Sequence, residues 1–229
     1  MPFQITDLIY RKKNAIKKDE AEFLIQEHLR LQNSGFFEHC NHAVTGKDTY
    51  SSFWCVIIKH GTEAFDIVFK ANQKIINDYL NYLDSFKMFH VEIRNTMLYS
   101  HTYRLLKYDV GAKIHPHIDQ GVFTYASATF NLNNDYEGGD FVFFNGHHKV
   151  KLDAREGMIW PADYFWVHEV EPITKGARYS TNSFLQQIPT EMKIQIMDYV
   201  EANTNPFKMT PPQKDYEKKY KYRIKQPKL

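Results

Sequence analysis

The chain has 229 residues, of which 43% are hydrophobic and 24% charged, and its net charge is +2. This length allows one large domain with a real core, and the small net charge gives no general argument for a nucleic-acid partner or an acidic substrate. The two cysteines, Cys40 and Cys55, lack metal-binding or redox spacing, so no disulfide framework is expected. No stretch has the pattern of a signal peptide or a membrane span, which predicts a soluble, cytoplasmic protein without membrane contact.

Two helices are predicted in the first hundred residues. After an irregular or short-strand entry at residues 1–13, apolar residues recur at helical spacing over 18–31, and Asn33-Ser-Gly35 ends that helix. Thr62 can cap a second helix, whose apolar stripe from Phe65 to Leu83 keeps helical spacing. We expect this stripe to pack against one face of a sheet.

The segments around these helices differ in polarity. The apolar run 53–58 predicts a buried strand, whereas the polar residues 36–52 are expected to form a solvated loop. Residues 87–107 alternate as in one or two further strands.

From residue 100 onward the chain consists of short runs separated by turn residues, which is typical of an antiparallel barrel or sandwich. Gly138-Gly139 and Asn145-Gly146 are strong turn signals. We expect strands near 101–108, 112–118, 122–132, 139–145, 148–153, 156–160, 164–171 and 177–187.

The C-terminal segment is polar. Residues 191–202 predict a short helix, and the tail 214–229 interleaves lysines with tyrosines. Such a tail can bind single-stranded nucleic acid through phosphate contacts and stacking, or it can be a solvated segment whose tyrosines pack back on the domain. We favour the solvated segment and leave the nucleic-acid partner as an alternative.

A metal site is indicated within the strand series. His117 and Asp119 are two residues apart, so in an extended strand their side chains share one face, and His168 is the obvious third ligand. Two histidines and one carboxylate form the facial triad that binds non-haem Fe(II). His115, on the same face as His117, competes for the first position. Arg178 follows His168 by ten residues, a distance at which a neighbouring strand can direct a guanidinium, which binds carboxylates bidentately, into the same pocket.

Five sequence elements occur in a fixed order between residues 108 and 178, and together they resemble the Fe(II)/2-oxoglutarate-dependent dioxygenases of the prolyl 4-hydroxylase type. The elements are Tyr108/Gly111, His117/Asp119, Glu137-Gly-Gly-Asp140, His168-Glu-Val-Glu-Pro172 and Arg178. The resemblance covers roughly residues 100–187. The chain departs from the family pattern at Ile114, where many relatives have Tyr, and at Arg178, where relatives carry Lys.

The resemblance implies a fold that is mainly β with flanking helices (α+β). Its core would be a double-stranded β-helix, or jelly roll, with the N-terminal helices packed on one sheet. We therefore expect a single domain over 1–229. Residues 1–100 would give helical and strand support, 101–188 would form the catalytic jelly-roll core, and 189–229 would be a C-terminal extension.

The resemblance also implies the chemistry of the site. His117, Asp119 and His168 would hold Fe(II), and Arg178 and Tyr108 would bind the co-substrate 2-oxoglutarate. Ser180 lies on the same strand face as Arg178 and could add a hydroxyl, and Asn131 and Thr129 are further candidates. The implied reaction uses O2, with ascorbate as a reductant, to hydroxylate a C–H bond while 2-oxoglutarate is converted to succinate and CO2.

Several substrates are compatible with this chemistry. The resemblance points first to a peptidyl proline in a peptide or protein, and the alternatives are a small metabolite, a free amino acid or a nucleic acid. Nucleic-acid demethylases of the superfamily carry a second Arg six residues after the first, where this chain has Phe184. A non-catalytic β-barrel with a structural metal is a third interpretation, although structural zinc sites are usually closed and four-coordinate. The expected substrate-facing residues are His115, Trp166, Arg104 and Tyr125.

Overall fold

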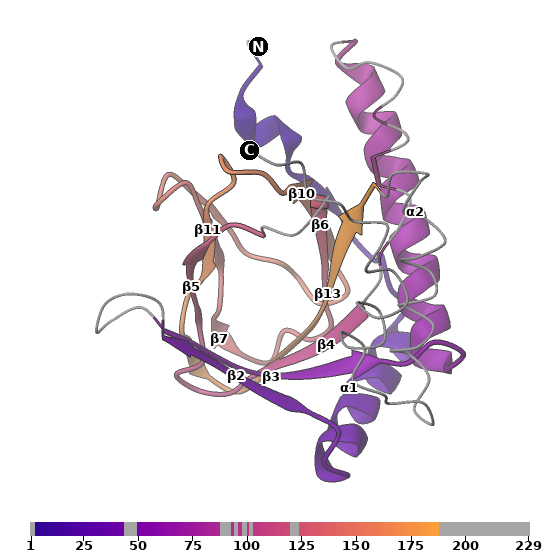
Figure 1. Ribbon diagram of the computed structural model, residues 1–229, viewed down its shortest axis with the longest axis vertical. Coiled ribbons are helices and arrows are strands. Elements are labelled where there is room, and N and C mark those ends of the chain that lie inside the picture. Colours follow the sequence, from indigo (N-terminus) through magenta and orange to yellow (C-terminus); the bar gives the residue numbers. More distant parts are fainter. Residues whose placement is uncertain are drawn as a thin grey trace, which may run out of the picture.

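Two facing β-sheets and a layer of helices make up the structure, a computed structural model that describes residues 3–43, 50–87, 93, 96–97, 100, 103–119 and 124–187. The large sheet has seven strands in the order β1-β10-β6-β13-β4-β3-β2, and the small sheet has four in the order β5-β11-β8-β9. Figure 1 shows the small sheet facing the large one, while both helices cover the opposite face of the large sheet. This is the mainly β architecture with N-terminal helices on one sheet that the sequence predicts.

The boundaries of the elements follow the turn residues of the sequence. The N-terminal elements are η1 (Ile5–Leu8), β1 (Tyr10–Lys12), α1 (Lys18–Asn33), β2 (Glu38–Ala43), β3 (Tyr50–Ile58) and α2 (Glu63–Ser85). The later strands are β4 (Tyr103–Tyr108), β5 (Ile114–His117), β6 (Thr124–Asn131), β7 (Glu137–Gly138), β8 (Phe141–Phe143), β9 (His148–Val150), β10 (Gly157–Pro161), β11 (His168–Val170), β12 (Ile173–Lys175) and β13 (Arg178–Gln186).

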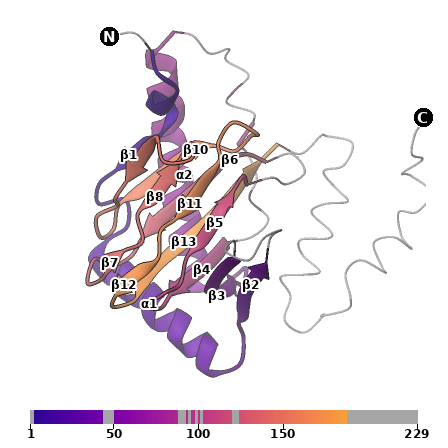
Figure 2. The same cartoon turned by 90° about the vertical axis from the view of Figure 1, so that its left-hand side faces the viewer.

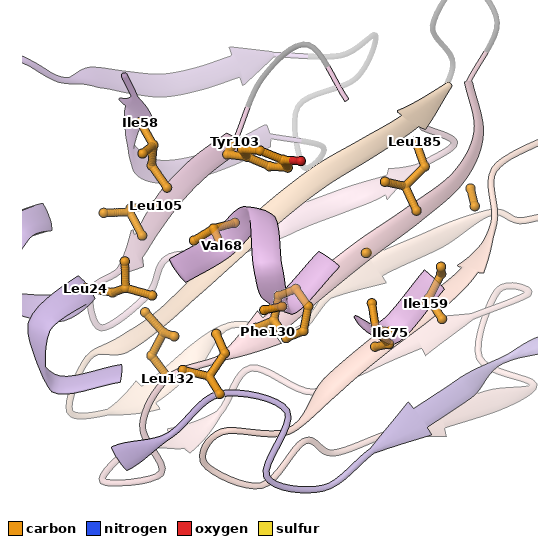
Figure 3. Packing of buried hydrophobic residues seen from close by; sticks show 14 of the residues in the cluster. Leu24, Ile58, Val68, Ile75, Tyr103, Leu105, Phe130, Leu132, Ile159 and Leu185 are labelled. Carbon is orange, nitrogen blue, oxygen red and sulfur yellow. The ribbon is translucent and has the colours of Figure 1, made fainter. Parts of the chain in front are cut away.

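Both helices pack their apolar stripes on the large sheet. Thr62 caps α2 by accepting a hydrogen bond from the backbone N–H of Phe65 at 3.3 Å. Figure 3 shows Val68 and Ile75 of α2 among side chains of the sheet, such as Phe130. Burying these residues removes apolar surface from water and fixes the sheet on its helix side. None of the helices within the described residues is long and apolar enough to cross a membrane.

Alternation along the strands gives the large sheet two distinct faces. Tyr103 and Leu105 of β4 point to the helices, whereas Leu106 and Tyr108 lie in a different cluster on the opposite face. We call the face turned toward the small sheet the inner face. The same alternation places Arg178 and the residues at even positions after it in β13 on the inner face, because β13 pairs with β4 in register Arg178↔Tyr108.

The structure corrects one prediction for the N-terminal half and confirms another. The loop predicted for residues 36–52 is wrong for residues 38–43 and 50–52, because β2 and the beginning of β3 pair as antiparallel strands and extend the large sheet beside β4. Residues 44–49 lie outside the described part of the chain. In the sheet order β2 is the edge strand, a position at which polar residues are common. The short-strand entry predicted for residues 1–13 is confirmed by β1, which pairs with β10 at the other edge.

The later strands match the predicted positions with shorter boundaries. The strand expected at 164–171 begins only at His168, because residues before it turn: the side chain of Asp163 accepts the N–H of Phe165 and its carbonyl accepts that of Trp166. Two short strands, β7 and β12, form an additional antiparallel pair. The strand alternation near 88–92, the helix 191–202 and the tail 214–229 lie outside the described residues.

Candidate active site

Three polar side chains converge where the small sheet faces the large one. His117 ends β5 and His168 begins β11, and the two strands pair antiparallel in register His168↔His117 (Figure 1). Asp119 follows two residues after His117, and its carboxylate lies 3.3 Å from His117 Nε2 and 3.4 Å from His168 Nε2. One possible ligand atom from each of the three residues can be chosen so that all three atoms lie within 4.8 Å of one another. The predicted triad therefore forms a group of the size that one metal ion requires.

Backbone carbonyls fix the orientation of both imidazoles. His117 Nδ1 lies 2.8 Å from the carbonyl oxygen of His115, and His168 Nδ1 lies 2.9 Å from that of Trp166. A carbonyl can only accept, so each Nδ1 carries a proton. The Nε2 atom of each ring is then the one that faces Asp119, and it can bind a metal when it is unprotonated. This arrangement is the usual way of preparing histidine ligands for a metal.

The charges in this group depend on one another. Burial raises the pKa of Asp119, but the neighbouring His168 and His117 lower it by more, so the carboxyl group stays ionised. Burial lowers the pKa of His168 below its ordinary value. Burial acts in the same direction on His117, but its hydrogen bond and charge interaction with Asp119 raise the pKa above the ordinary value. A divalent cation among these groups would neutralise the buried carboxylate.

Aromatic side chains form a wall along one side of the buried His168. The ring of His168 lies 5.2 Å from that of Trp160 and 5.6 Å from that of Phe143, measured between centroids. Phe141 completes this side at 6.5 Å. These side chains belong to an apolar cluster between the two sheets, which keeps water away from that side of the group. Trp160 therefore packs in the apolar cluster between the two sheets.

Arg178 is a buried cation with an open hydrogen-bonding position. It is 1% exposed, and its guanidinium carbon lies 4.9 Å from the ring centre of Phe141 and 5.2 Å from that of Tyr108. Its Nε donates to Asn131 Oδ1 at 3.1 Å, whereas the buried Nη1 has no hydrogen-bond partner. An unpaired buried guanidinium nitrogen is costly, and a carboxylate would satisfy it. The residues of the site therefore fit both a divalent iron and a carboxylate-bearing co-substrate.

Asn131 has a role that sequence reasoning did not assign. Its Oδ1 also accepts from the Tyr136 hydroxyl at 3.1 Å, and its Nδ2 lies within hydrogen-bonding distance of the backbone oxygens of residues 133, 152 and 153. All of its polar atoms are therefore engaged by the protein. The carboxamide orients Arg178 rather than pointing a free group at a ligand, and only the side-chain contacts reveal this.

The other predicted residues lie at different distances from the triad. His115 is half-buried with its ring 5.8 Å from that of His117, and Ser180 is buried in register with Asn131 on the inner face. Tyr125, at the start of β6, is 47% exposed. Trp166 is only 2% exposed and packs in the aromatic wall, because the turn before β11 directs its ring toward Phe143 and Phe144. Thr129 donates its hydroxyl hydrogen to the Thr181 carbonyl.

Comparison with known proteins identifies the part of the chain that carries this geometry. The family model for the 2OG-Fe(II) oxygenase superfamily matches residues 103–186, the segment that contains the triad and Arg178. This segment is a 2OG-Fe(II) oxygenase domain. The resemblance seen in the ordered motifs is therefore confirmed for residues 103–186.

Two bacterial relatives match about a third of the chain. A PKHD-type hydroxylase of Methylobacterium nodulans is 36% identical over 88 residues, which cover 32% of this chain and 38% of the relative. A PKHD-type hydroxylase of Cupriavidus pinatubonensis is 36% identical over 84 residues, covering 35% and 36%. The chain thus spans less than half the length of these relatives.

Solved structures extend the likeness beyond the matched segment. A prolyl hydroxylase from Trichoplax adhaerens, in complex with a peptide fragment of the hypoxia inducible factor oxygen degradation domain, has a TM-score of 0.61. It is 16% identical, and the superposition covers 80% of this chain and 84% of that chain. A prolyl-4-hydroxylase of Pseudomonas putida has a TM-score of 0.59 at 18% identity and covers 80% and 97%. At these identities the likeness shows a shared fold over a larger part of the chain than residues 103–186.

Proposed function

We propose that the chain is an Fe(II)- and 2-oxoglutarate-dependent dioxygenase that hydroxylates a C–H bond and releases succinate and CO2. The observation that carries this proposal is the pairing of two features between the same two sheets. One is the His117–Asp119–His168 group, whose donor atoms lie within 4.8 Å of one another, and the other is the unpaired buried Nη1 of Arg178. A non-catalytic binding module would have no need for a metal site with only three protein ligands together with a buried, unpaired guanidinium nitrogen.

Each residue has a separable task in this proposal. His117, Asp119 and His168 hold the iron, with the Nε2 atoms as ligands because both Nδ1 atoms are engaged by carbonyls. Arg178 takes the distal carboxylate of 2-oxoglutarate through its free nitrogen, and Tyr108 packs under its guanidinium. Bound Fe(II) would supply the activation of O2 and the oxidation of both substrates.

The protein also excludes water from this chemistry. Trp160, Phe141 and Phe143 close the site on the His168 side, which strengthens the electrostatic interactions of Arg178 and Asp119 by lowering the local dielectric. Ser180 lies on the inner face and is buried, so its hydroxyl can add a hydrogen bond to the co-substrate. Ascorbate would serve as an external reductant.

A peptidyl proline is the substrate we propose first. The names of the PKHD-type hydroxylases and prolyl hydroxylases that share the domain or the fold support this choice. The Trichoplax adhaerens structure contains a peptide fragment and therefore supports a peptide or protein substrate. His115, near the triad, and Tyr125, exposed at the start of β6, would border the groove.

A structural metal site is the weaker candidate. Within the described residues, the cluster capable of holding a metal contains three donors rather than the four of a closed zinc site. The buried cation beside it has no role in a purely structural site.

The experiment is a succinate assay on purified protein supplied with Fe(II), 2-oxoglutarate and proline-containing peptides in air. We expect succinate release that requires Fe(II), together with a mass gain of one oxygen in a peptide. His168→Ala should reduce succinate release by at least about a hundredfold, because it removes a metal ligand. Equal succinate release by the parent and by His168→Ala would refute the dioxygenase proposal.

A further inference from the structure

A row of inner-face side chains crosses the large sheet beside the candidate site. The register Ile57↔Arg104↔Asn182↔Thr129 joins β3, β4, β13 and β6 (Figure 2). Arg104 shares the face of Leu106 and Tyr108, because all three occupy alternate positions of β4. A second cation therefore lies on the same face as Arg178.

Arg104 has no counter-ion among the described residues. Its guanidinium carbon lies 5.0 Å from the ring centre of Phe184, and its buried Nε has no hydrogen-bond partner. Lys107 of the same strand provides a contrast, because it lies on the opposite face and forms an ion pair with Asp109 at 2.9 Å. A half-buried guanidinium supported only by an aromatic ring retains most of its capacity to bind an anion.

The support of Arg104 connects it to the triad. Phe184 is in register with Ser127 of β6, and Ser127 is in register with Trp160 of β10, whose ring lies 5.2 Å from that of His168. The path from Arg104 to the metal ligands therefore crosses from β4 over β13 to β6. Ser127 lies two strands across the sheet and two residues along it from Arg104, about 12 Å in all. Arg178 lies one strand across and four residues along, about 14 Å from Arg104, which is too long for one 2-oxoglutarate to need both arginines at once.

We propose that Arg104 binds a carboxylate of the substrate, so that the polypeptide acted on carries Asp or Glu close to the hydroxylated residue. About 12 Å corresponds to three or four residues of extended chain, so an acidic residue about three positions from the hydroxylated residue is expected. The inference rests on the proposed dioxygenase function and adds a substrate class to it. A charge-assisted hydrogen bond of this kind should favour acidic over basic peptides by about tenfold or more.

The test uses peptides of one sequence with a single proline. Glu, Gln or Lys is placed three residues before it in one set and three residues after it in another, and oxygen gain is followed by mass. The parent protein should hydroxylate the Glu peptide of at least one set about tenfold faster than its Lys counterpart. Arg104→Gln should remove this preference, and Arg104→Glu should reverse it toward the Lys peptide. Because each result is a ratio within one variant, partial loss of folded protein does not affect it.

Lys107→Gln is the matched control, since it removes one positive charge from the opposite face of the same strand. It should retain the parent's preference for Glu peptides. Succinate release by the parent reports separately on the proposed function. If that release continues while Glu and Lys peptides gain oxygen equally, or while no peptide gains oxygen, the inference about Arg104 is wrong and the dioxygenase proposal stands. A preference unchanged in Arg104→Glu would also overturn the inference.

Discussion

Asn131 holds one edge of the Arg178 guanidinium, with 3.1 Å between Asn131 Oδ1 and Arg178 Nε, and leaves the Nη1 position open. The two residues lie on β6 and β13, neighbouring strands in the middle of the large sheet, although they are 47 positions apart in sequence. The cation is therefore fixed from the centre of the large sheet rather than from a surface loop. We infer that the direction of the free nitrogen, and with it the position of a bound carboxylate, depends on Asn131.

Replacing this amide should affect co-substrate binding more than turnover. In Asn131→Ala, Arg178 loses its Nε acceptor and its buried charge can rotate away from the co-substrate. We expect the KM for 2-oxoglutarate to rise about tenfold, equivalent to the loss of one hydrogen bond to a charged group, with a smaller change in kcat. Steady-state succinate release at varied 2-oxoglutarate concentrations measures both constants.

Asn133→Ala provides the control for this prediction. Asn133 also ties backbone segments together, donating to the Ala177 carbonyl at 2.7 Å and accepting from the Tyr179 N–H at 2.8 Å, but it does not contact Arg178. Both variants should lose stability, and only Asn131→Ala should raise the KM for 2-oxoglutarate. A similar KM increase in both variants would mean that loop rigidity, not the orientation of Arg178, sets the affinity.

The two histidines of β5 should differ in their effect on metal affinity. His117→Ala removes a proposed ligand, whereas His115→Ala removes a ring but keeps the backbone carbonyl that orients His117. We expect Fe(II) affinity, measured by anaerobic equilibrium dialysis, to fall by at least about a hundredfold in His117→Ala and by less than about tenfold in His115→Ala. The reverse order would identify His115 as the ligand.

Two glycines with positive φ should respond differently to alanine. A Cβ at Gly138, where φ is +79°, would collide with the carbonyl oxygen of Pro172 in the turn that pairs β7 with β12. At Gly146, where φ is +98°, the same Cβ would meet no atom within 4 Å. Urea unfolding should therefore show a loss of about 3 kcal/mol for Gly138→Ala, and about 1 kcal/mol for Gly146→Ala from backbone strain alone. Equal losses would show that the approach to Pro172 adds nothing to the strain.

His28 should make stability dependent on pH. Burial between α1 and the large sheet lowers the pKa of His28 to about 4, so the folded protein keeps the imidazole neutral in mildly acidic solution. The unfolded chain takes up this proton below its ordinary pKa of about 6.5. The unfolded state then binds more protons, and stability decreases as pH falls from about 6.5 toward 4 while the contribution above 6.5 stays constant.

The size of this effect can be isolated with a substitution. Between pH 7 and pH 5 the loss assigned to His28 is about 2 kcal/mol. In the parent, the ring of His28 lies 5.8 Å from that of Tyr179, measured between centroids. His28→Leu places a side chain of similar size there that cannot titrate. Urea unfolding at pH 7 and pH 5 should show a smaller pH difference in His28→Leu than in the parent. An identical difference would place the acid sensitivity elsewhere.

The order of motifs in the sequence predicted the site better than the fold around it. His117, Asp119, His168 and Arg178 are found together because their spacing follows from strands that must pair around a shared centre. The strand predicted at 53–58 is the larger part of β3, whereas β2 and the first residues of β3 were missed because a polar strand at a sheet edge has no apolar period to distinguish it from a loop.

Contacts between side chains distant in sequence were the least predictable part of the site. Asn131 was a candidate for the co-substrate, yet its amide is used entirely to support Arg178 and neighbouring loops. Trp166 was expected at the substrate groove, whereas its ring is buried and its carbonyl orients His168. In both residues the type and strand position are compatible with several partners, and only the packing of the two sheets selects one.

Binding of 2-oxoglutarate with and without Fe(II), measured by anaerobic equilibrium dialysis, tests the central claim most directly. The geometry predicts about one equivalent of 2-oxoglutarate bound per chain when Fe(II) is present, much weaker binding without Fe(II), and loss of binding in both His168→Ala and Arg178→Met. Binding of 2-oxoglutarate that is equally tight without metal, or that survives in either variant, would contradict a site built from the triad and the guanidinium together.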